Sequence, residues 1–313
     1  MLTLILIALV FFLIGCSSDK IYSYDVVDCK IKNNEFVLDG KLTIPQSKKK
    51  VPCVILIAGS GPSDMNGTVN NQTPYKDISD GLAEKGIASL RYNKVTYQYN
   101  KEIASDYDLT IEDEYFYALD SAVDLVSNNE NIDSNKIYLI GHSLGSQILS
   151  EYMMENENIA GGIIMAGSTM HLLDILLEQT KQQDDNLYNS YKPYCEYAKS
   201  LNEVPEGEEK YFYFGAYTAY YVSYNQLKRE NISEIQKPLL FMQGKLDLQI
   251  NIHHFENYKE LFNGKNNATF KEYEFLNHLF TNGENETISN AYFKQDKVSD
   301  EVIHDIYLFI KNN

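Results

Sequence analysis

A serine lies at the centre of the sequence Gly141-His142-Ser143-Leu144-Gly145, which has the pattern G-x-S-x-G. The residues before it are apolar and the residues after it have helical spacing, so the sequence predicts a strand, a sharp turn and a helix. Such a turn holds a serine hydroxyl above the edge of a sheet, and the two glycines leave room for neighbouring backbone. Ser143 is therefore the candidate nucleophile.

A serine hydroxyl is a weak nucleophile at neutral pH, so it needs a base and a third group that orients the base. Asp247 follows an expected strand at residues 238–243, and His278 follows an expected strand at residues 269–275. His278 is therefore the candidate base, and Asp247 is the candidate carboxylate that orients it.

The other histidines have simpler interpretations. His142 lies inside the turn and is expected to support the fold, and His253 and His254 lie at a helix start, where surface polarity explains them. His278 alone follows the last expected strand. The five others are His142, His171, His253, His254 and His304.

Two N–H groups must stabilise the negative oxygen of a tetrahedral intermediate. One is expected from the backbone of Leu144, and the other from Ser60, in the turn after the apolar residues 52–58. No metal site is predicted, because the chain lacks a His-Glu-x-x-His motif and its cysteines do not cluster. No cofactor is predicted either, because the turn at residues 59–62 lacks the rest of a phosphate-binding motif.

Strand and helix patterns alternate along most of the chain. This alternation predicts an α/β fold with a mostly parallel central sheet and helices on both faces. Residues 171–237 break the pattern and hold ten of the 25 tyrosines, so they are expected to form a helical cap over the active site. The expected strands are residues 22–30, 35–45, 52–58, 87–92, 136–142, 159–166, 238–243 and 269–275, and the expected helices include residues 74–85, 109–126, 252–262 and 302–311.

Five short sequences resemble motifs of the bacterial α/β-hydrolase esterases that are related to the serine aminopeptidase and acyl-CoA thioesterase groups. The chain order of Ser143, Asp247 and His278 is also the order found in that fold. The resemblance runs from about residue 35 to the end and is weakest in the cap. The sequences are GSGPSDMNG at residues 59–67, RYNKV at 91–95, GHSLG at 141–145, QGKLDLQI at 243–250 and NHLF at 277–280.

The resemblance implies an α/β-hydrolase domain over residues 21–313, with the cap inserted at about residues 171–237. It also implies a small-molecule carboxylic ester as substrate. The chain departs from the family pattern beside the pocket mouth, where Met65, Asn66, Asn93 and Val95 stand in place of charged residues. These changes bear on the substrate preference and leave the three candidate catalytic residues in place.

The N-terminal residues point to export. Residues 2–14 are apolar except for Thr3, a length that fits a signal-peptide core better than a membrane-spanning helix. The sequence Leu13-Ile14-Gly15-Cys16 resembles the lipobox of bacterial lipoproteins, whose cysteine is lipidated and becomes the mature N-terminus. The resemblance implies a signal peptide at residues 1–15, a tether at residues 16–20 and a protein of the cell envelope, outside the cytoplasm, that Cys16 anchors to a membrane.

The composition of the chain limits the classes of partner that the protein is expected to bind. The net charge of −17 argues against binding to a nucleic-acid backbone. Three cysteines besides Cys16 form no disulfide framework, although a bridge between Cys29 and Cys195 remains open. Cys53 is expected to be a buried apolar residue, and the sequence leaves the oligomeric state open.

The leading prediction is a serine hydrolase that cleaves carboxylic esters of short to medium acyl groups through an acyl-enzyme intermediate. The cap favours compact, partly polar acyl groups, because it is rich in tyrosine and has only one strongly apolar run, at residues 172–177. Two alternatives remain. One is a serine peptidase or amidase, with a cap carboxylate for the substrate amine, and the other is a non-catalytic envelope lipoprotein that binds a ligand. The carboxylates considered for this role are Asp184, Glu196, Glu203 and Glu206.

Overall fold

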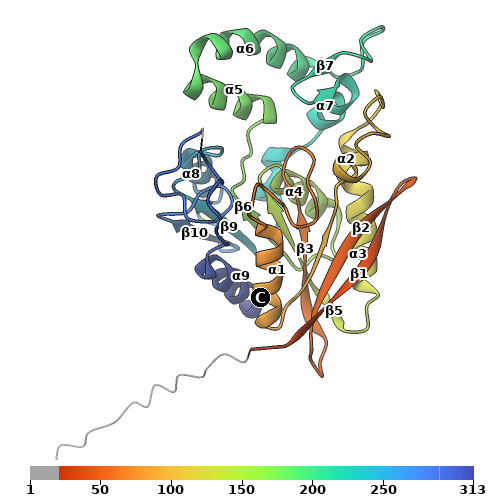
Figure 1. The fold of residues 1–313 in the computed structure, drawn as a ribbon, viewed down its shortest axis with the longest axis vertical. Helices are drawn as coiled ribbons and strands as arrows, with labels where there is room; N and C mark the ends of the chain where they lie inside the picture. The colour runs from red at the N-terminus through yellow and green to blue at the C-terminus, as the bar shows by residue number, and fades with distance from the viewer. Residues whose placement is uncertain (1–20, 289) are drawn as a thin grey trace, which may run out of the picture.

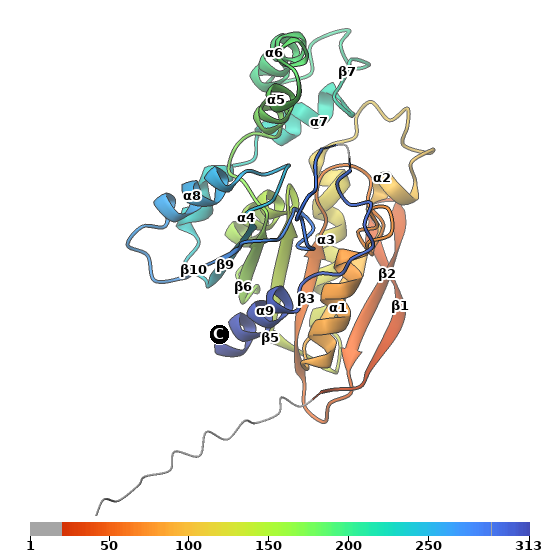
Figure 2. The same ribbon diagram turned by 60° about the vertical axis from the view of Figure 1, so that its left-hand side comes forward.

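The computed structural model describes residues 21–288 and 290–313, which fold around one large sheet (Figures 1 and 2). The expected signal peptide, the tether and Cys16 lie outside these residues. The sheet has eight strands in the order β1-β2-β4-β3-β5-β6-β9-β10. They are β1 (Tyr24–Asn33), β2 (Phe36–Pro45), β3 (Val51–Ile57), β4 (Ala88–Tyr92), β5 (Ile132–His142), β6 (Gly161–Met165), β9 (Leu239–Gly244) and β10 (Ala268–Tyr273).

The sheet is mostly parallel, as the sequence predicted. Strands β1 and β2 form an antiparallel hairpin, and β2 pairs antiparallel with β4. From β4 to β10 every neighbouring pair is parallel. The carboxyl ends of the six parallel strands therefore meet at one edge, where loops from distant parts of the chain come together.

Alternate side chains of β3 belong to two separate apolar clusters, one on each face of the sheet. Cys53, Ile55 and Ile57 belong to the cluster that includes residues of α3 (Tyr117–Ser127), α4 (Gly145–Glu155) and α8 (Ile252–Leu261). Val54 and Leu56 belong to the cluster that includes residues of α1 (Pro74–Glu84) and α9 (Asp300–Asn312). A buried parallel strand of this kind reads as a continuous apolar run, which is why the sequence revealed it.

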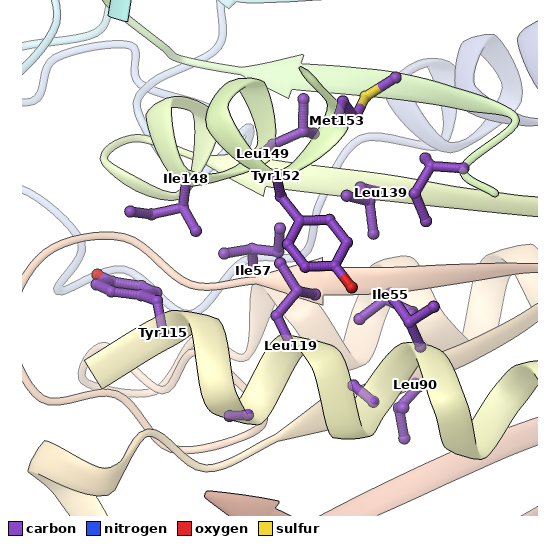
Figure 3. Packing of buried hydrophobic residues seen from close by; sticks show 14 of the residues in the cluster. Ile55, Ile57, Leu90, Tyr115, Leu119, Leu139, Ile148, Leu149, Tyr152 and Met153 are labelled. Carbon is purple, nitrogen blue, oxygen red and sulfur yellow. The ribbon is translucent and has the colours of Figure 1, made fainter. Parts of the chain in front are cut away.

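Figure 3 shows the first cluster from close by. The side chains of Leu119 of α3, Tyr152 of α4 and Ile55 of β3 lie close together there, and all three are almost completely buried. Because protein interiors are close-packed, this contact holds α4 in a definite place under β5. The turn that carries Ser143 joins these two elements.

The segment between β6 and β9 forms a separate layer at the carboxyl edge of the sheet (Figures 1 and 2). It has a small apolar cluster of its own, which includes Leu173, Leu177, Tyr213 and Tyr221. Two short strands, which the sequence did not reveal, interrupt the helices. The segment contains α5 (Leu172–Gln183), α6 (Asp185–Ser200), β7 (Phe212–Tyr213), β8 (Ala216–Tyr217), α7 (Thr218–Asn225) and the 3-10 helix η2 (Arg229–Glu234).

The expected helix at residues 109–126 begins differently from the prediction. Its first turn is a π-helix, η1 (Glu112–Phe116), and α3 follows directly. A short helix, α2 (Val95–Gln98), precedes it. Among the described residues, no helix is both long and apolar enough to span a bilayer.

Candidate active site

Ser143 lies in a strained turn between β5 and α4. Its φ of 54° falls in the left-handed region, which a non-glycine residue rarely adopts. The backbone is crowded here, since a Cβ added to Gly145 would lie 2.3 Å from the carbonyl oxygen of Ile57. The N–H of Ser143 donates to Met165 O at 2.9 Å, which ties the turn to the end of β6.

Asp247 and His278 come together from the loops after β9 and β10. His278 Nδ1 lies 2.7 Å from Asp247 Oδ2, and both side chains are buried. The other carboxylate oxygen, Oδ1, accepts the backbone N–H groups of Gln249 and Ile250 at 2.8 and 2.9 Å. A carboxylate only accepts, so His278 carries a hydrogen on Nδ1, and whenever the ring is neutral Nε2 presents a lone pair.

Ser143 lies close to this pair through its neighbour in the chain. The ring of His142 lies 4.6 Å from the ring of His278, measured between centroids. Within the described residues, no hydrogen bond joins Ser143 Oγ to His278. In ligand-free hydrolases this contact is commonly long and shortens when substrate binds.

The two predicted oxyanion donors border the same cavity as Ser143. This cavity has a volume of about 290 Å³, and Ser60, Ser143 and Leu144 line it. In the part of the chain that the structure describes, the backbone N–H groups of Ser60 and Leu144 donate no hydrogen bond. They are therefore available to an anionic oxygen beside Ser143.

Lys94 anchors the loop that carries Ser60, a role that the sequence analysis missed. Its ammonium group donates to Gly59 O at 3.0 Å and to Gly61 O at 2.9 Å, on either side of Ser60. It also lies 2.9 Å from Glu114 Oε1, and both side chains are buried. Burial lowers the pKa of Lys94, and the charge of Glu114 opposes that shift.

The same network reaches the cap. Glu114 accepts a hydrogen bond at Oε2 from Tyr220 of α7, at 2.7 Å. The π-helical turn η1 supplies Glu114, and π-turns of this kind are frequent at functional sites. The only sign of Lys94 in the sequence was its place within the RYNKV motif.

A second connection, which includes Tyr75 of α1, joins the Ser60 loop to the loop of His278. Tyr75 Oη lies 3.0 Å from His142 Nδ1 and accepts the N–H of Gly59 at 3.3 Å. His142 Nε2 lies 2.9 Å from His278 O. Because a carbonyl only accepts, His142 carries its hydrogen on Nε2, and Nδ1 accepts from Tyr75. Burial, assisted by the charge of His278, lowers the pKa of His142 to about 3, so its ring is neutral at ordinary pH.

The surface interpretation is wrong for His254. Its side chain is 1% exposed, because it packs against Ser168 and the cap helix α5. The structure brings Glu178 of α5 together with His253 and His254 in the first turn of α8. This is a group of metal-binding side chains that no sequence motif indicated, since Glu178 lies 75 and 76 residues before the two histidines.

The three cysteines among the described residues are unpaired. Cys29, Cys53 and Cys195 are free thiols, so the bridge that the sequence left open between Cys29 and Cys195 does not form. Cys53 is fully buried, as expected for a small apolar residue of a central strand.

A second cavity, of about 340 Å³, also borders the Ser60 loop. Ser60, Gly61, Leu172, Phe214 and Tyr221 line both cavities. The two cavities are therefore neighbours that share part of their walls.

Comparison with known proteins agrees with this architecture. Residues 16–170 match the family model described as lecithin:cholesterol acyltransferase. The curated esterase EstD from Thermotoga maritima is 30% identical over 273 residues, which are 86% of this chain and 64% of EstD. The chain thus matches less than two thirds of that relative's length.

Two solved esterases have the same arrangement of elements. Est1E from Butyrivibrio proteoclasticus is 15% identical, with a TM-score of 0.59 over 91% of this chain and 99% of Est1E. The Pyrococcus furiosus esterase Pf2001 is 16% identical, with a TM-score of 0.58 over 92% of this chain and 91% of that protein. The chain has the α/β-hydrolase fold. At these identities the likeness concerns the fold alone, whereas EstD is a homologue in sequence.

Proposed function

We propose that this protein is a serine hydrolase that cleaves carboxylic esters with Ser143 as nucleophile, His278 as base and Asp247 as orienting carboxylate. One observation carries the proposal. The buried pair of His278 and Asp247, 2.7 Å apart, lies at the carboxyl edge of the sheet beside the strained turn of Ser143. This arrangement has the parts of a nucleophile, an oriented base and a vacant pair of N–H donors.

The reaction follows from these groups. Ser143 Oγ attacks the ester carbonyl while His278 Nε2 accepts the hydroxyl proton, and Asp247 stabilises the imidazolium that forms. The N–H groups of Leu144 and Ser60 bind the negative oxygen of the tetrahedral intermediate. His278 then returns the proton to the departing alkoxide, which leaves an acyl-enzyme. Water attacks the acyl-enzyme by the same steps, and the carboxylic acid is released.

Homology supports an ester as the substrate. EstD is named an esterase, and its similarity extends over 86% of this chain. The cavities support a compact acyl group, because the one beside Ser143 measures about 290 Å³, at the small end of ordinary ligand pockets. We therefore propose esters of short to medium acyl groups.

The peptidase alternative has less support. A substrate amine would need a carboxylate near Ser143, but the four carboxylates considered, Asp184, Glu196, Glu203 and Glu206, are exposed. None of them is among the described residues that line the two cavities.

Labelling with a fluorophosphonate probe tests the proposal. The probe reacts with a serine only where a base activates it, so the protein should be labelled at Ser143 and Ser143→Ala should not. Ser134→Ala, at an exposed position of β5, is the control and is expected to leave labelling intact. Absence of labelling in the parent protein would favour a non-catalytic ligand-binding protein.

We also propose that the protein is exported and anchored to a membrane of the cell envelope through lipid on Cys16. The apolar residues 2–14 and the sequence Leu13-Ile14-Gly15-Cys16 support this. Several acyl chains on one residue would hold the protein firmly, whereas a single chain gives only marginal binding.

A further inference from the structure

The cap meets the hydrolase core at a group of three metal-binding side chains. Glu178 belongs to the cap helix α5, and His253 and His254 belong to the first turn of α8. Figures 1 and 2 show α5 above α8, at the side of the sheet where β9 and β10 end. One ligand atom from each residue lies within 4.8 Å of the other two.

The distances suit a small metal ion. Glu178 Oε1 lies 3.4 Å from His253 Nε2, and Glu178 Oε2 lies 3.0 Å from His254 Nε2. Zinc binds such atoms at about 2.0–2.2 Å with near-tetrahedral angles, which separates neighbouring ligand atoms by about 3.3 Å. The two distances run to different oxygens of the Glu178 carboxylate, and one ligand atom from each residue lies within 4.8 Å of the others, so small shifts of the partly exposed Glu178 and His253 side chains would place all three around one ion.

The ring of His254 is held in the orientation that a ligand needs. Its Nδ1 lies 2.8 Å from Ser168 Oγ, which also accepts the N–H of Met170 at 2.9 Å. Metal-binding histidines commonly have such a partner on the second nitrogen, which fixes the ring and leaves the other nitrogen for the metal. His254 and Ser168 are both buried, so this arrangement is rigid.

The site also has access to solvent. The side chains of His253 and Glu178 are 48% and 31% exposed, so an ion can enter and keep water as a further ligand. Two imidazoles and one carboxylate form a donor set typical of zinc and similar transition metals, whereas magnesium and calcium prefer oxygen ligands alone.

We propose that Glu178, His253 and His254 bind one divalent transition-metal ion of the zinc class, which fastens the cap helix α5 to α8. The ion has a structural role. Helix α5 supplies Leu172, Leu173, Ile175 and Leu176 to the cavity beside Ser143, so fixing α5 fixes that wall. A neighbouring bond, from Gln179 Nε2 to Gln249 O at 3.0 Å, already joins the same two parts of the chain.

The test measures metal binding by the full, untagged chain after removal of metal with a chelator. Calorimetry with Zn²⁺ should give one ion per chain. Co²⁺ should give the visible absorption of a four- or five-coordinate site, without the intense near-ultraviolet band of a thiolate ligand. At a hundredfold excess over Kd, zinc should raise the Tm by about 3–6 °C.

Three variants locate the site. Glu178→Gln and His253→Ala lie at partly exposed positions, and each should weaken Zn²⁺ binding at least about tenfold and remove the rise in Tm. His254→Ala should do the same. Because His254 is buried, this variant can also lose stability, so the test depends on the other two variants. The matched controls are Glu256→Gln, on the exposed side of α8, and His304→Ala, on α9. Both should bind zinc as the parent does.

The effect on catalysis rests on the proposed ester hydrolysis, but the binding measurement does not. Stripping the metal should raise KM for an ester several-fold with a smaller change in kcat, because the cap wall loses its fixed position. Zinc binding without esterase activity would leave the metal site standing and overturn the proposed function. No zinc binding, or binding that Glu178→Gln and His253→Ala leave unchanged, would overturn the metal site.

Discussion

In the proposed mechanism, His278 would use one ring nitrogen to accept the Ser143 proton, while Asp247 orients the ring through the other nitrogen. The short contact with Asp247 places the hydrogen on Nδ1, and the two backbone N–H groups at Oδ1 hold the carboxylate in turn. The geometry therefore couples His278 to Asp247, and the proposed mechanism adds Ser143 to this unit.

Substitution of these residues should show that dependence. Ser143→Ala and His278→Ala should each lower kcat by at least about 10⁴-fold, and the double variant should lose little more, because they act as one unit. Asp247→Asn should cost less, since the ring remains but loses its orienting charge. Initial rates with p-nitrophenyl butyrate measure this. Retained activity in His278→Ala would contradict the assignment.

His142 links stability to pH. The ordinary histidine pKa is 6.5, and burial lowers that of His142 to about 3 in the folded protein. Between these values the unfolded chain binds one proton more than the folded chain, so this residue stabilises the fold fully above pH 6.5 and progressively less as pH falls toward 3. The slope is about 1.4 kcal/mol per pH unit.

The His142→Asn variant isolates this contribution. Its free energy of unfolding should fall less steeply than that of the parent between pH 6.5 and 4.5, by about 1.4 kcal/mol per unit. Urea unfolding at pH 7.5, 6.5, 5.5 and 4.5 gives both slopes, and exposed His304→Asn serves as the control. Equal slopes in His142→Asn and the parent would show that the ring is not held neutral.

At the scale of elements, the loop after β3 is held from two sides. Lys94 binds the carbonyl groups on either side of Ser60, and Tyr75 binds the N–H of Gly59. Glu114 then connects Lys94 to the cap through Tyr220. A change in the cap can therefore reach the oxyanion donors without touching Ser143.

Variants of the Lys94–Glu114 ion pair should show its effect on stability separately from its effect on activity. Lys94→Met leaves Glu114 buried and unpaired, so it should lower the free energy of unfolding by about 3–5 kcal/mol. The double variant Lys94→Met/Glu114→Gln should recover much of this loss, yet kcat/KM should stay low because Gly61 O loses its donor and Gly59 O keeps only the Tyr115 hydroxyl. The exposed Lys76→Met should change stability by less than about 0.5 kcal/mol. If the double variant kept full kcat/KM, Lys94 would not be needed to hold the Ser60 loop in place.

The cap should set the acyl length. We expect kcat/KM for p-nitrophenyl esters to be highest at butyrate or octanoate, and at least about tenfold lower at palmitate, given a cavity of about 290 Å³. Leu176→Ala widens this cavity and should shift the optimum toward longer chains. Leu261→Ala, exposed on α8, is the matched control. A maximum at palmitate in the parent protein would reject this account of the pocket.

At the scale of the whole molecule, the proposed anchor and the catalytic domain are separate. In the expected mature protein a tether of a few residues would leave the domain beside the membrane, and the net charge of −17 offers no attraction to anionic lipid. Membrane binding would then depend on lipid alone.

Cys16→Ala should therefore release the protein from the membrane or block its processing. Fractionation of cells and the mass of the mature N-terminus measure this, with Cys29→Ala as a control that should stay anchored. A Cys16→Ala protein that remains membrane-bound and normally processed would contradict the lipobox assignment. This prediction concerns residues outside those that the structure describes.

The sequence determined the features that depend on local chemistry. Apolar runs revealed the buried strands, because a parallel strand is covered on both faces, and the spacing of Gly141, Ser143 and Gly145 indicated the turn. Asp247 and His278 were identified because each follows a strand, and parallel strands end at one edge of the sheet. Their contact in the structure follows from that topology, whereas their catalytic role stays a prediction.

The tertiary structure decided which distant side chains meet. No sequence pattern indicated the roles of Lys94 and Tyr75. Both residues hold the Ser60 loop, and that loop belongs to a different segment of the chain. His254 looked like a surface residue until α5 of the cap covered it and brought Glu178 to its ring. The sequence left open whether Cys29 and Cys195 form a disulfide, and the structure shows both as free thiols. Contacts between segments far apart in sequence depend on packing of the whole chain, and local patterns do not contain that information.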